Sequence, residues 1–291
     1  MHPDTLKNIT LGVYNYANTA NYGSLGLGFG QGVNSNRSNV VDELVSQGAT
    51  QAKAFGLSLG TNNGPNEGSL VLGGIDTKKF SGALQRVPVI DPPTYPFDYS
   101  EYSYLPLDIV NEVAAAYSIR NTSDWMNEWY IIPCRYRDIV QGSVDLHFGA
   151  LNVSIPYSDF IISSQMLEEI DYTTAPVKCY LSIFPWDENF REEVDFYYLG
   201  HTFLRAVYAV YDQDNRAVWL ANRNDCGSDI KGITKDESSI SGVKGQCNGP
   251  GLDASSNSTS SADKESSPSM RFGMSGLVWV TIGFARVLTG Y

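Results

Sequence analysis

The sequence is poor in charged residues, and positive charge is the scarcer kind. Only 18% of its 291 residues are charged, and 20 Lys and Arg stand against 32 Asp and Glu, which gives a net charge of −12. Binding to a phosphate backbone needs clustered Lys and Arg, so we expect no nucleic-acid partner. The chain is long enough for one large or two ordinary domains, and 42% apolar residues exclude a disordered chain.

Histidine is scarce as well. The three histidines, His2, His147 and His201, do not have the spacing of a metal site. The glycine-rich stretch 23–32 fits neither G-x-G-x-x-G nor a Walker A loop, which argues against a phosphate site. We therefore expect no metal and no cofactor.

Long hydrophobic runs are missing from both ends. Residues 1–4 contain neither a basic nor an apolar segment, so this chain shows no signal peptide. Residues 272–285 are apolar, but as a helix they would reach about 21 Å, short of a bilayer core of ~30 Å. A Ser-rich spacer before an apolar tail is typical of a GPI-attachment signal, although Arg286 interrupts the tail. The alternative is an ordinary buried strand, and a membrane is expected only through such an anchor.

The residues that are plentiful point to a β-rich extracellular protein. There are 27 Gly and 18 Tyr, and the four Cys permit two disulfides. Five N-x-[ST] sequons are candidate glycosylation sites, and chance alone would give a few in a chain rich in Asn, Ser and Thr. They begin at Asn8, Asn36, Asn121, Asn152 and Asn257. Together with the paired cysteines they favour a secreted protein.

Periodicity predicts mostly strands with two or three short helices. Helical spacing covers residues 39–47, and again 105–117, where Ile109, Val113 and Ala116 would form one stripe. Strands are expected at 9–14, 54–59, 68–74, 130–133, 143–148, 151–156, 179–184, 196–199, 206–211 and 217–221. Residues 248–268 are Ser, Asn, Gly and Asp with scarcely a large apolar side chain, which indicates a flexible linker.

Several segments, in this order, resemble the fungal-type pepsin-like aspartic proteases of peptidase family A1. No single motif is specific, but their order and spacing over residues 11–222 are. The segments are 25–29 (LGLGF), 68–84 followed by 87–89 (VPV), 104–106 (YLP) before a helix, 132–134, 144–149, 153–160, and finally 198–200 (YLG), 203–205, 208–212 and Asn215.

The resemblance implies a mostly β, pepsin-like fold with a partial N-terminal lobe and a nearly complete C-terminal lobe. It divides the chain into four parts: 1–60 as a remnant of the N-terminal lobe with the interlobe strand, 61–226 as the C-terminal lobe, 227–270 as a linker and 271–291 as an apolar tail. Cys134 and Cys179 lie where this lobe has its own disulfide. Cys226 and Cys247 bracket a 20-residue loop, and a bridge over it would stabilise the fold by roughly 3 kcal/mol.

The family cleaves peptide bonds with two aspartates that share one proton and activate a water. Each aspartate stands in Asp-Thr-Gly or Asp-Ser-Gly, and this sequence contains neither motif. Asp76 precedes Thr77 but lies on the wrong turn, and the Gly is missing. The weak candidate is Asp98, shortly before Tyr104, although the bulky Tyr99 stands where Thr or Ser is expected and Ser100 replaces Gly. His201 is a smaller departure, at a position where the family often has a structural Asp.

Three hypotheses follow for the function. The first is an aspartic endopeptidase family member, truncated and inactive alone, whose substrates in complete form would be proteins or peptides. The second is a stable non-catalytic relative that binds peptides or acts at the cell surface. The third is a homodimer that brings two copies of Asp98 together. By resemblance the protein would be secreted or at the cell surface.

Overall fold

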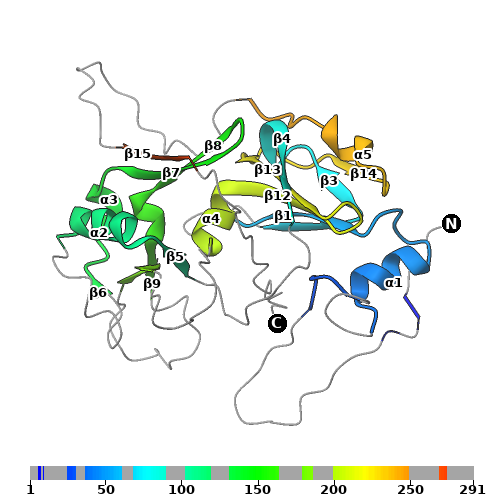
Figure 1. The fold of residues 1–291 in the computed structure, drawn as a ribbon, viewed down its shortest axis with the longest axis horizontal. Coiled ribbons are helices and arrows are strands. Elements are labelled where there is room, and N and C mark those ends of the chain that lie inside the picture. Colours follow the sequence, from blue (N-terminus) through cyan, green and yellow to red (C-terminus); the bar gives the residue numbers. More distant parts are fainter. Residues whose placement is uncertain are drawn as a thin grey trace, which may run out of the picture. The chain divides into compact units, whose positions relative to one another are not determined.

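A computed structural model describes most of the chain between residues 25 and 248 and one short segment beyond it. The described residues are 6–7, 9, 25–30, 37–60, 68–89, 102–118, 131–163, 179–185, 199–248 and 269–273. The chain forms two compact units. Unit 1 comprises residues 1–99, 207–251 and 281–291, and unit 2 comprises 100–206 and 252–280. The described elements are mostly strands, which confirms the mostly β prediction (Figure 1).

Unit 1 is built on a five-stranded antiparallel sheet. The strand order is β2 (Ser69–Leu72), β1 (Ala54–Ser58), β12 (Val207–Asp212), β13 (Ala217–Arg223) and β4 (Phe80–Pro88). The three inner strands are buried at nearly every position. Their Val, Phe, Tyr and Trp content favours this pleated, two-sided burial.

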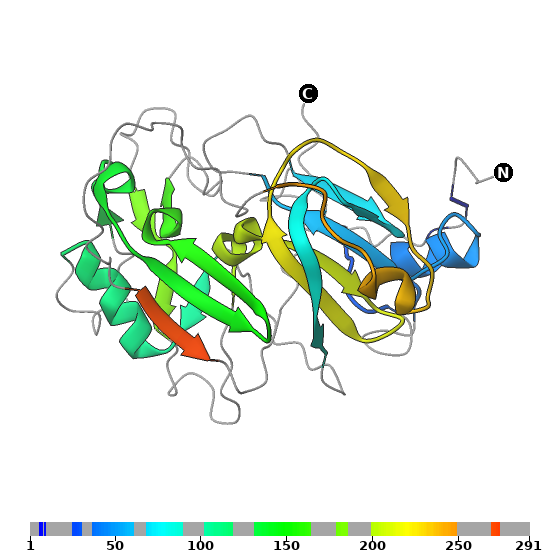
Figure 2. The same ribbon diagram turned by 90° about the horizontal axis from the view of Figure 1, so that it is seen from above.

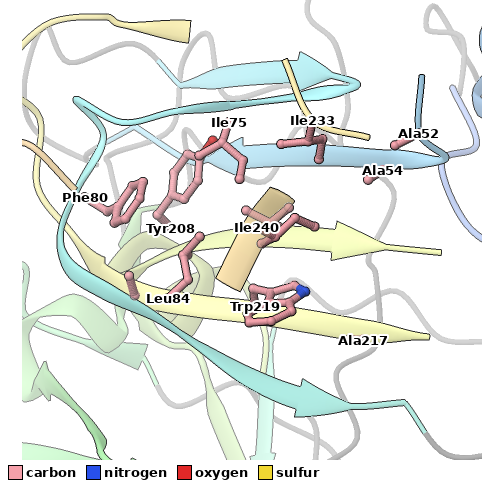
Figure 3. Packing of buried hydrophobic residues seen from close by; sticks show 12 residues of the cluster. Ala52, Ala54, Ile75, Phe80, Leu84, Tyr208, Ala217, Trp219, Ile233 and Ile240 are labelled. Carbon is pink, nitrogen blue, oxygen red and sulfur yellow. The ribbon is translucent and has the colours of Figure 1, made fainter. Parts of the chain in front are cut away.

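One face of this sheet carries the apolar core of unit 1 (Figure 3). Phe80 stacks on Tyr208 with ring centroids 4.9 Å apart, and Trp219 packs in the same cluster. Gly56 is required here because a Cβ at this position would lie 2.1 Å from Tyr208 Oη. The Tyr208 hydroxyl in turn accepts a hydrogen bond of 2.8 Å from the Asp76 amide. Burial raises the pKa of Tyr208, so it stays a neutral phenol.

The segment after β13 folds onto this core, which corrects the predicted start of the linker at residue 227. Strand β14 (Ile230–Gly232) pairs antiparallel with β3 (Gly74–Asp76), and helix α5 (Ser238–Ser241) follows. Ile233 and Ile240 are 2% and 0% exposed and belong to the core cluster. The Ser- and Lys-rich composition of this segment gave no indication that these two isolated apolar residues are buried. Because the described fold continues to Asn248, a linker can begin only after that residue.

Helix α1 (Val40–Ser46) confirms the helix expected at 39–47. Asn39 caps it: its Oδ1 accepts from the Asp42 amide at 2.9 Å, and Asp42 Oδ2 accepts from the Asn39 amide at 3.1 Å. Asp42 also pairs with Lys53, Nζ to Oδ1, at 2.7 Å. The buried residues of the helix are Val41 and Asp42.

Unit 2 combines one long hairpin with short strands. The hairpin joins β7 (Ser143–Phe148) to β8 (Leu151–Pro156), and β15 (Ser269–Gly273) lies parallel to β7 on its other edge (Figures 1 and 2). A second sheet has the order β6 (Ile131–Ile132), β10 (Cys179–Leu181) and β9 (Ile161–Ser163). A parallel pair joins β5 (Ser103–Leu105) to β11 (Ile183–Pro185). The helices are α2 (Leu107–Ala116), α3 (Tyr136–Ile139), the 3-10 turn η1 (Tyr157–Phe160) and α4 (His201–Ala206).

Helix α2 confirms the helix expected at 105–117 but turns a different stripe inward. Pro106 is its N-cap, and Ile109, Val110, Val113 and Ala114 are buried. Ala116 is exposed, because it is the last residue of the helix and lies outside this stripe. The strands expected at 9–14 and 196–199 lie outside the described residues.

Each unit contains one disulfide, and every cysteine is paired. Cys134 is joined to Cys179 in unit 2, with Cα atoms 5.1 Å apart, and the bond lies beside the β6–β10 pairing. Cys226 is joined to Cys247 in unit 1, with Cα atoms 5.8 Å apart. Within the described part of the chain, no helix is long and apolar enough to cross a membrane.

Candidate functional site

The candidate acid Asp98 lies outside the described residues, whereas the strand that follows it is described. That strand is β5, and helix α2 begins directly after it at Leu107. Strand β5 is therefore the first described element after Asp98. The candidate site is built up here from β5 and the elements that contact it.

Strand β5 is held by a parallel partner and not by a hairpin. Ser103 and Tyr104 pair with Ile183 and Phe184 of β11. The Ser103 amide also donates to the Ser182 carbonyl at 3.0 Å. Parallel pairing requires a long connection between the two strands, and here residues 106–182 supply it. Strand β5 itself is thus anchored by a distant part of the sequence.

Buried hydroxyl groups connect β5 to the start of α4. Ser103, Ser182 and Thr202 are at most 2% exposed. Ser103 Oγ accepts from the Gly200 amide at 3.1 Å, and Ser182 Oγ lies 3.2 Å from Thr202 Oγ1. Buried hydroxyls are costly unless they are hydrogen-bonded, so this network fixes how Gly200 and α4 lie against β5.

Ser182 extends the network to a further element. Both its hydroxyl and its amide donate to the Phe160 carbonyl, at 2.9 and 2.7 Å. Phe160 ends the 3-10 turn η1, so one buried serine connects η1 with β11 and α4. These hydroxyls bond to backbone groups and to each other, which is a positioning role and not that of an activated nucleophile.

Aromatic side chains pack beside the same strand pair. The ring of Phe184 lies 5.8 Å from that of Tyr104 and meets the ring of Tyr102 edge-on at 5.3 Å. Phe184 is 8% exposed, while both tyrosines are partly accessible. The chain that leaves the candidate loop is therefore lined by partly exposed tyrosines, which can contact a ligand through ring faces and hydroxyls.

Two buried aspartates elsewhere are fully engaged in structural hydrogen bonds. Asp76 accepts from Ser228 Oγ at 2.7 Å and from the amides of Asp229 and Lys78 at 2.8 and 3.1 Å. Asp212 accepts from the amide and side chain of Asn215, with Nδ2 to Oδ2 at 2.8 Å. Both carboxylates stabilise turns, and neither is available as an acid catalyst.

The sequence analysis missed the buried hydroxyls, because isolated Ser and Thr residues give no periodic signal. It also missed the contacts of the segment after β13. Among the described residues, no three His, Cys, Asp or Glu side chains are grouped so as to hold a metal ion. Of the five sequons, only Asn152 is described: its side chain is exposed on β8. Asn8, Asn36, Asn121 and Asn257 lie outside the described residues.

Comparison with known proteins adds an independent finding. A family model described as "Eukaryotic aspartyl protease" matches residues 7–104 and 100–223. Secreted aspartic protease 5 of Candida albicans is 26% identical over 233 residues, which cover 71% of this chain and 51% of that protein. Candidapepsin-3 of the same species is 27% identical over 223 residues, covering 68% of this chain and 52% of that protein.

The chain spans about half the length of the curated relatives it matches. Among solved structures, the aspartic proteinase from Irpex lacteus matches with a TM-score of 0.46 and 18% identity, over 64% of this chain and 61% of that one.

Proposed function

We propose, from the premise that this chain belongs to the eukaryotic aspartyl protease family, that the whole protein is a secreted aspartic endopeptidase that acts on proteins or peptides. The observation that carries the proposal is the family match on both sides of the candidate loop, over residues 7–104 and 100–223. The names of the relatives, secreted aspartic proteases, support secretion. We also retain the four-part division at residues 60, 226 and 270 as a proposal, with residues 227–247 moved from the linker to the folded part.

The proposed chemistry is attack of an activated water on the peptide carbonyl. One carboxylate takes a proton from the water while a protonated carboxyl holds the carbonyl oxygen, so two acids with different pKa values are needed. Asp98 is our candidate for one of them. The β5–β11 pair and the Ser103–Gly200 contact would position its loop. Because the sequence contains neither Asp-Thr-Gly nor Asp-Ser-Gly, we expect this chain alone to be inactive.

The test is a cleavage assay on the purified chain. An unfolded protein substrate is incubated between pH 3 and 7, and new termini are detected by mass spectrometry. Asp98→Asn is compared with Asp138→Asn, which makes the same charge change at an exposed position of α3. No new termini is the expected result. Cleavage that only Asp98→Asn abolishes would show that Asp98 acts as an acid, as in the homodimer hypothesis. Cleavage that survives Asp98→Asn would overturn the assignment of Asp98.

The alternative function is peptide binding or a cell-surface role without catalysis. Its basis is the degenerate sequence around Asp98 and the absence of both Asp-Thr-Gly and Asp-Ser-Gly. It predicts a soluble, monodisperse chain that binds unfolded peptides but leaves them intact. Binding can be measured by fluorescence anisotropy of labelled peptides, with Tyr104→Ala as the test variant, because Tyr104 is partly accessible beside the candidate loop. Unchanged binding by that variant would move the proposed binding surface elsewhere.

Secretion also makes Asn152 a candidate for N-glycosylation. Asn152 begins a sequon with Ser154 and lies exposed just after the hairpin turn, where Gly149 has φ 61°. Ser154→Ala removes the sequon and leaves the asparagine. We expect this variant, expressed in a eukaryotic secretory host, to lose the mass of one glycan. An unchanged mass would remove Asn152 from the candidates. A lipid anchor at the C-terminus is considered in the next subsection.

A further inference from the structure

Strand β7 would form an outer edge of its sheet without the C-terminal segment. Its partner β8 occupies one edge, with six paired positions from Ser143–Pro156 to Phe148–Leu151. The other edge is occupied by β15, in parallel register (Figures 1 and 2). An unpaired edge exposes a row of amides and carbonyls that can pair with another strand. The β7 edge is thus a surface that accepts an extended segment.

A buried carboxylate lies in the middle of this edge strand. Asp145 is only 8% exposed and stands between the buried Val144 and Leu146. Ser143 Oγ donates to its Oδ1 at 3.1 Å. A charge in such a position is costly unless it has partners, and charges in edge strands discourage pairing with unsuitable strands. A segment suited to this edge should therefore place a basic residue opposite Asp145.

The register of β15 meets this requirement. Arg271 stands opposite Asp145, while Met270 and Phe272 stand opposite Val144 and Leu146. In this register the apolar–basic–apolar sequence of β15 is aligned with the apolar–acidic–apolar sequence of β7. Opposite charges at paired positions favour a register, and a shift by one residue would move every side chain to the other face. Pro268 directly precedes the strand, where a missing amide donor is tolerated.

We propose that the β7 edge is a docking site for an extended apolar–basic–apolar segment, and that its occupant is residues 269–273 of the same chain. The twenty residues 249–268 are rich in Ser, a composition that predicts a flexible tether. Docking makes residues 269–273 a retained strand of unit 2. It is incompatible with the removal of the tail that attachment of a GPI anchor requires.

The first test is a disulfide designed from the register. Ser143 and Ser269 are paired positions, and all native cysteines are already bonded, so Ser143→Cys with Ser269→Cys adds the only free thiols. The control pairs Ser269→Cys with His147→Cys, about 13 Å further along β7 at ~3.3 Å per residue. We expect a crosslink within one chain for the first pair and none for the control.

The other results of the crosslinking experiment would overturn the proposal. A crosslink only between two chains would make a second copy the occupant. Equal crosslinking of both pairs, or of neither, would mean that the segment does not dock in this register. A secreted protein whose intact mass lacks residues 269–291 would show that the tail is removed instead of retained.

The second test reverses the charge of β15 and then asks whether a change in β7 compensates for it. Arg271→Asp puts like charges at paired positions, and Lys264→Asp makes the same reversal within the tether. Hydrogen–deuterium exchange of residues 143–148 should become about tenfold faster in Arg271→Asp, because local opening exposes the edge amides, and stay unchanged in Lys264→Asp. Adding Asp145→Asn to Arg271→Asp should slow the exchange again. Equal exchange in both charge reversals would contradict the charge-specified register.

Discussion

The two units of this protein are stabilised in different ways. Unit 1 has a continuous five-stranded sheet with long pairings, such as the six register pairs of β12 and β13, and an apolar core around Phe80, Tyr208 and Trp219. In unit 2, β5 and the short strands near it have only two or three residues, and buried hydroxyls fix them. The comparison teaches that regular pairing and apolar burial stabilise one part, while specific polar contacts position the other.

Unit 1 owes part of its stability to a segment beyond the family match. The family model ends at residue 223, and the chain then runs across the sheet as far as Cys247. The backbone amide of Gln246 donates to the Thr77 carbonyl at 2.7 Å, and its side-chain Nε2 donates to Thr77 Oγ1 at 2.8 Å. Asp229 and Ser228 hold Asp76 in the same turn. The segment thereby connects the turn after β3 to the Cys226–Cys247 disulfide.

The largest effect is expected from the core of unit 1. Phe80→Ala should lower the free energy of unfolding by about 3–5 kcal/mol, since Phe80 is fully buried and stacks on Tyr208. Urea unfolding followed by circular dichroism measures the change. Ile131→Ala, at a side chain that is 59% exposed, is the control and should change it by no more than about 0.5 kcal/mol. Similar losses in both variants would contradict the assignment of the core.

Removing each disulfide in turn compares how much stability it contributes to its unit. In the loop-entropy model the Cys134–Cys179 bond, with a separation of 45, contributes about 4 kcal/mol, and the Cys226–Cys247 bond, with a separation of 21, about 3 kcal/mol. Serine pairs at each bond should therefore destabilise in that order, as measured by urea unfolding. The reverse order would show that the closing segment of unit 1 matters more than loop length.

A smaller loss of stability is expected when one of the polar contacts in unit 2 is removed. Ser182→Ala removes a hydroxyl that bonds to Phe160 and Thr202, and should cost about 1–3 kcal/mol. Exchange of the amides in β11 and α4 should accelerate more than that of β12. Ser46→Ala, which changes an exposed hydroxyl on α1, is the control. Equal exchange in Ser182→Ala and the native chain would mean that the network does not position α4.

The smallest effect is electrostatic and lies in unit 1. Burial is the largest single influence on Asp225 and raises its pKa. The hydrogen bonds from Lys79, at 2.8 Å, and from the Gly227 amide, together with the charges of Lys79 and Arg223, outweigh burial, so the pKa of Asp225 lies below its ordinary 3.8. A carboxyl with a lowered folded-state pKa stabilises the fold above its unfolded pKa. This contribution disappears as the pH falls through the folded pKa. Asp225→Asn should therefore be less stable at pH 7 and lose less stability on acidification to pH 2. Parallel pH profiles would show that the Lys79 contact contributes nothing.

Local patterns located most of the described elements. The strands at 143–148 and 151–156 are present with the predicted bounds, and the helices at 39–47 and 105–117 differ by only a few residues. Strand alternation and helical spacing depend on neighbours two to four residues apart, so the sequence displays them directly. Cys134 and Cys179 pair as the resemblance implied, and Cys226 and Cys247 form the bridge considered for the loop between them.

Contacts between distant residues escaped this type of reasoning. The parallel pairing of β5 with β11 and the Ser103–Gly200 hydrogen bond join residues 80 or more positions apart. Ile233 and Ile240 are apolar residues isolated in a polar segment, so the local sequence did not indicate that they are buried in the core. The stripe predicted through Ala116 was wrong for a related reason, because the surroundings of a helix decide which of two overlapping stripes is buried.

The sequence by itself determined the class of this protein: strand alternation, paired cysteines and an ordered series of short motifs already indicated a mostly β member of the pepsin-like family. Only the tertiary structure decided which strands pair, where the folded part ends and which hydroxyls hold the strand after the candidate loop. The physical reason is that propensity and periodicity are local properties, whereas strand register and the burial of polar groups depend on partners brought together by folding.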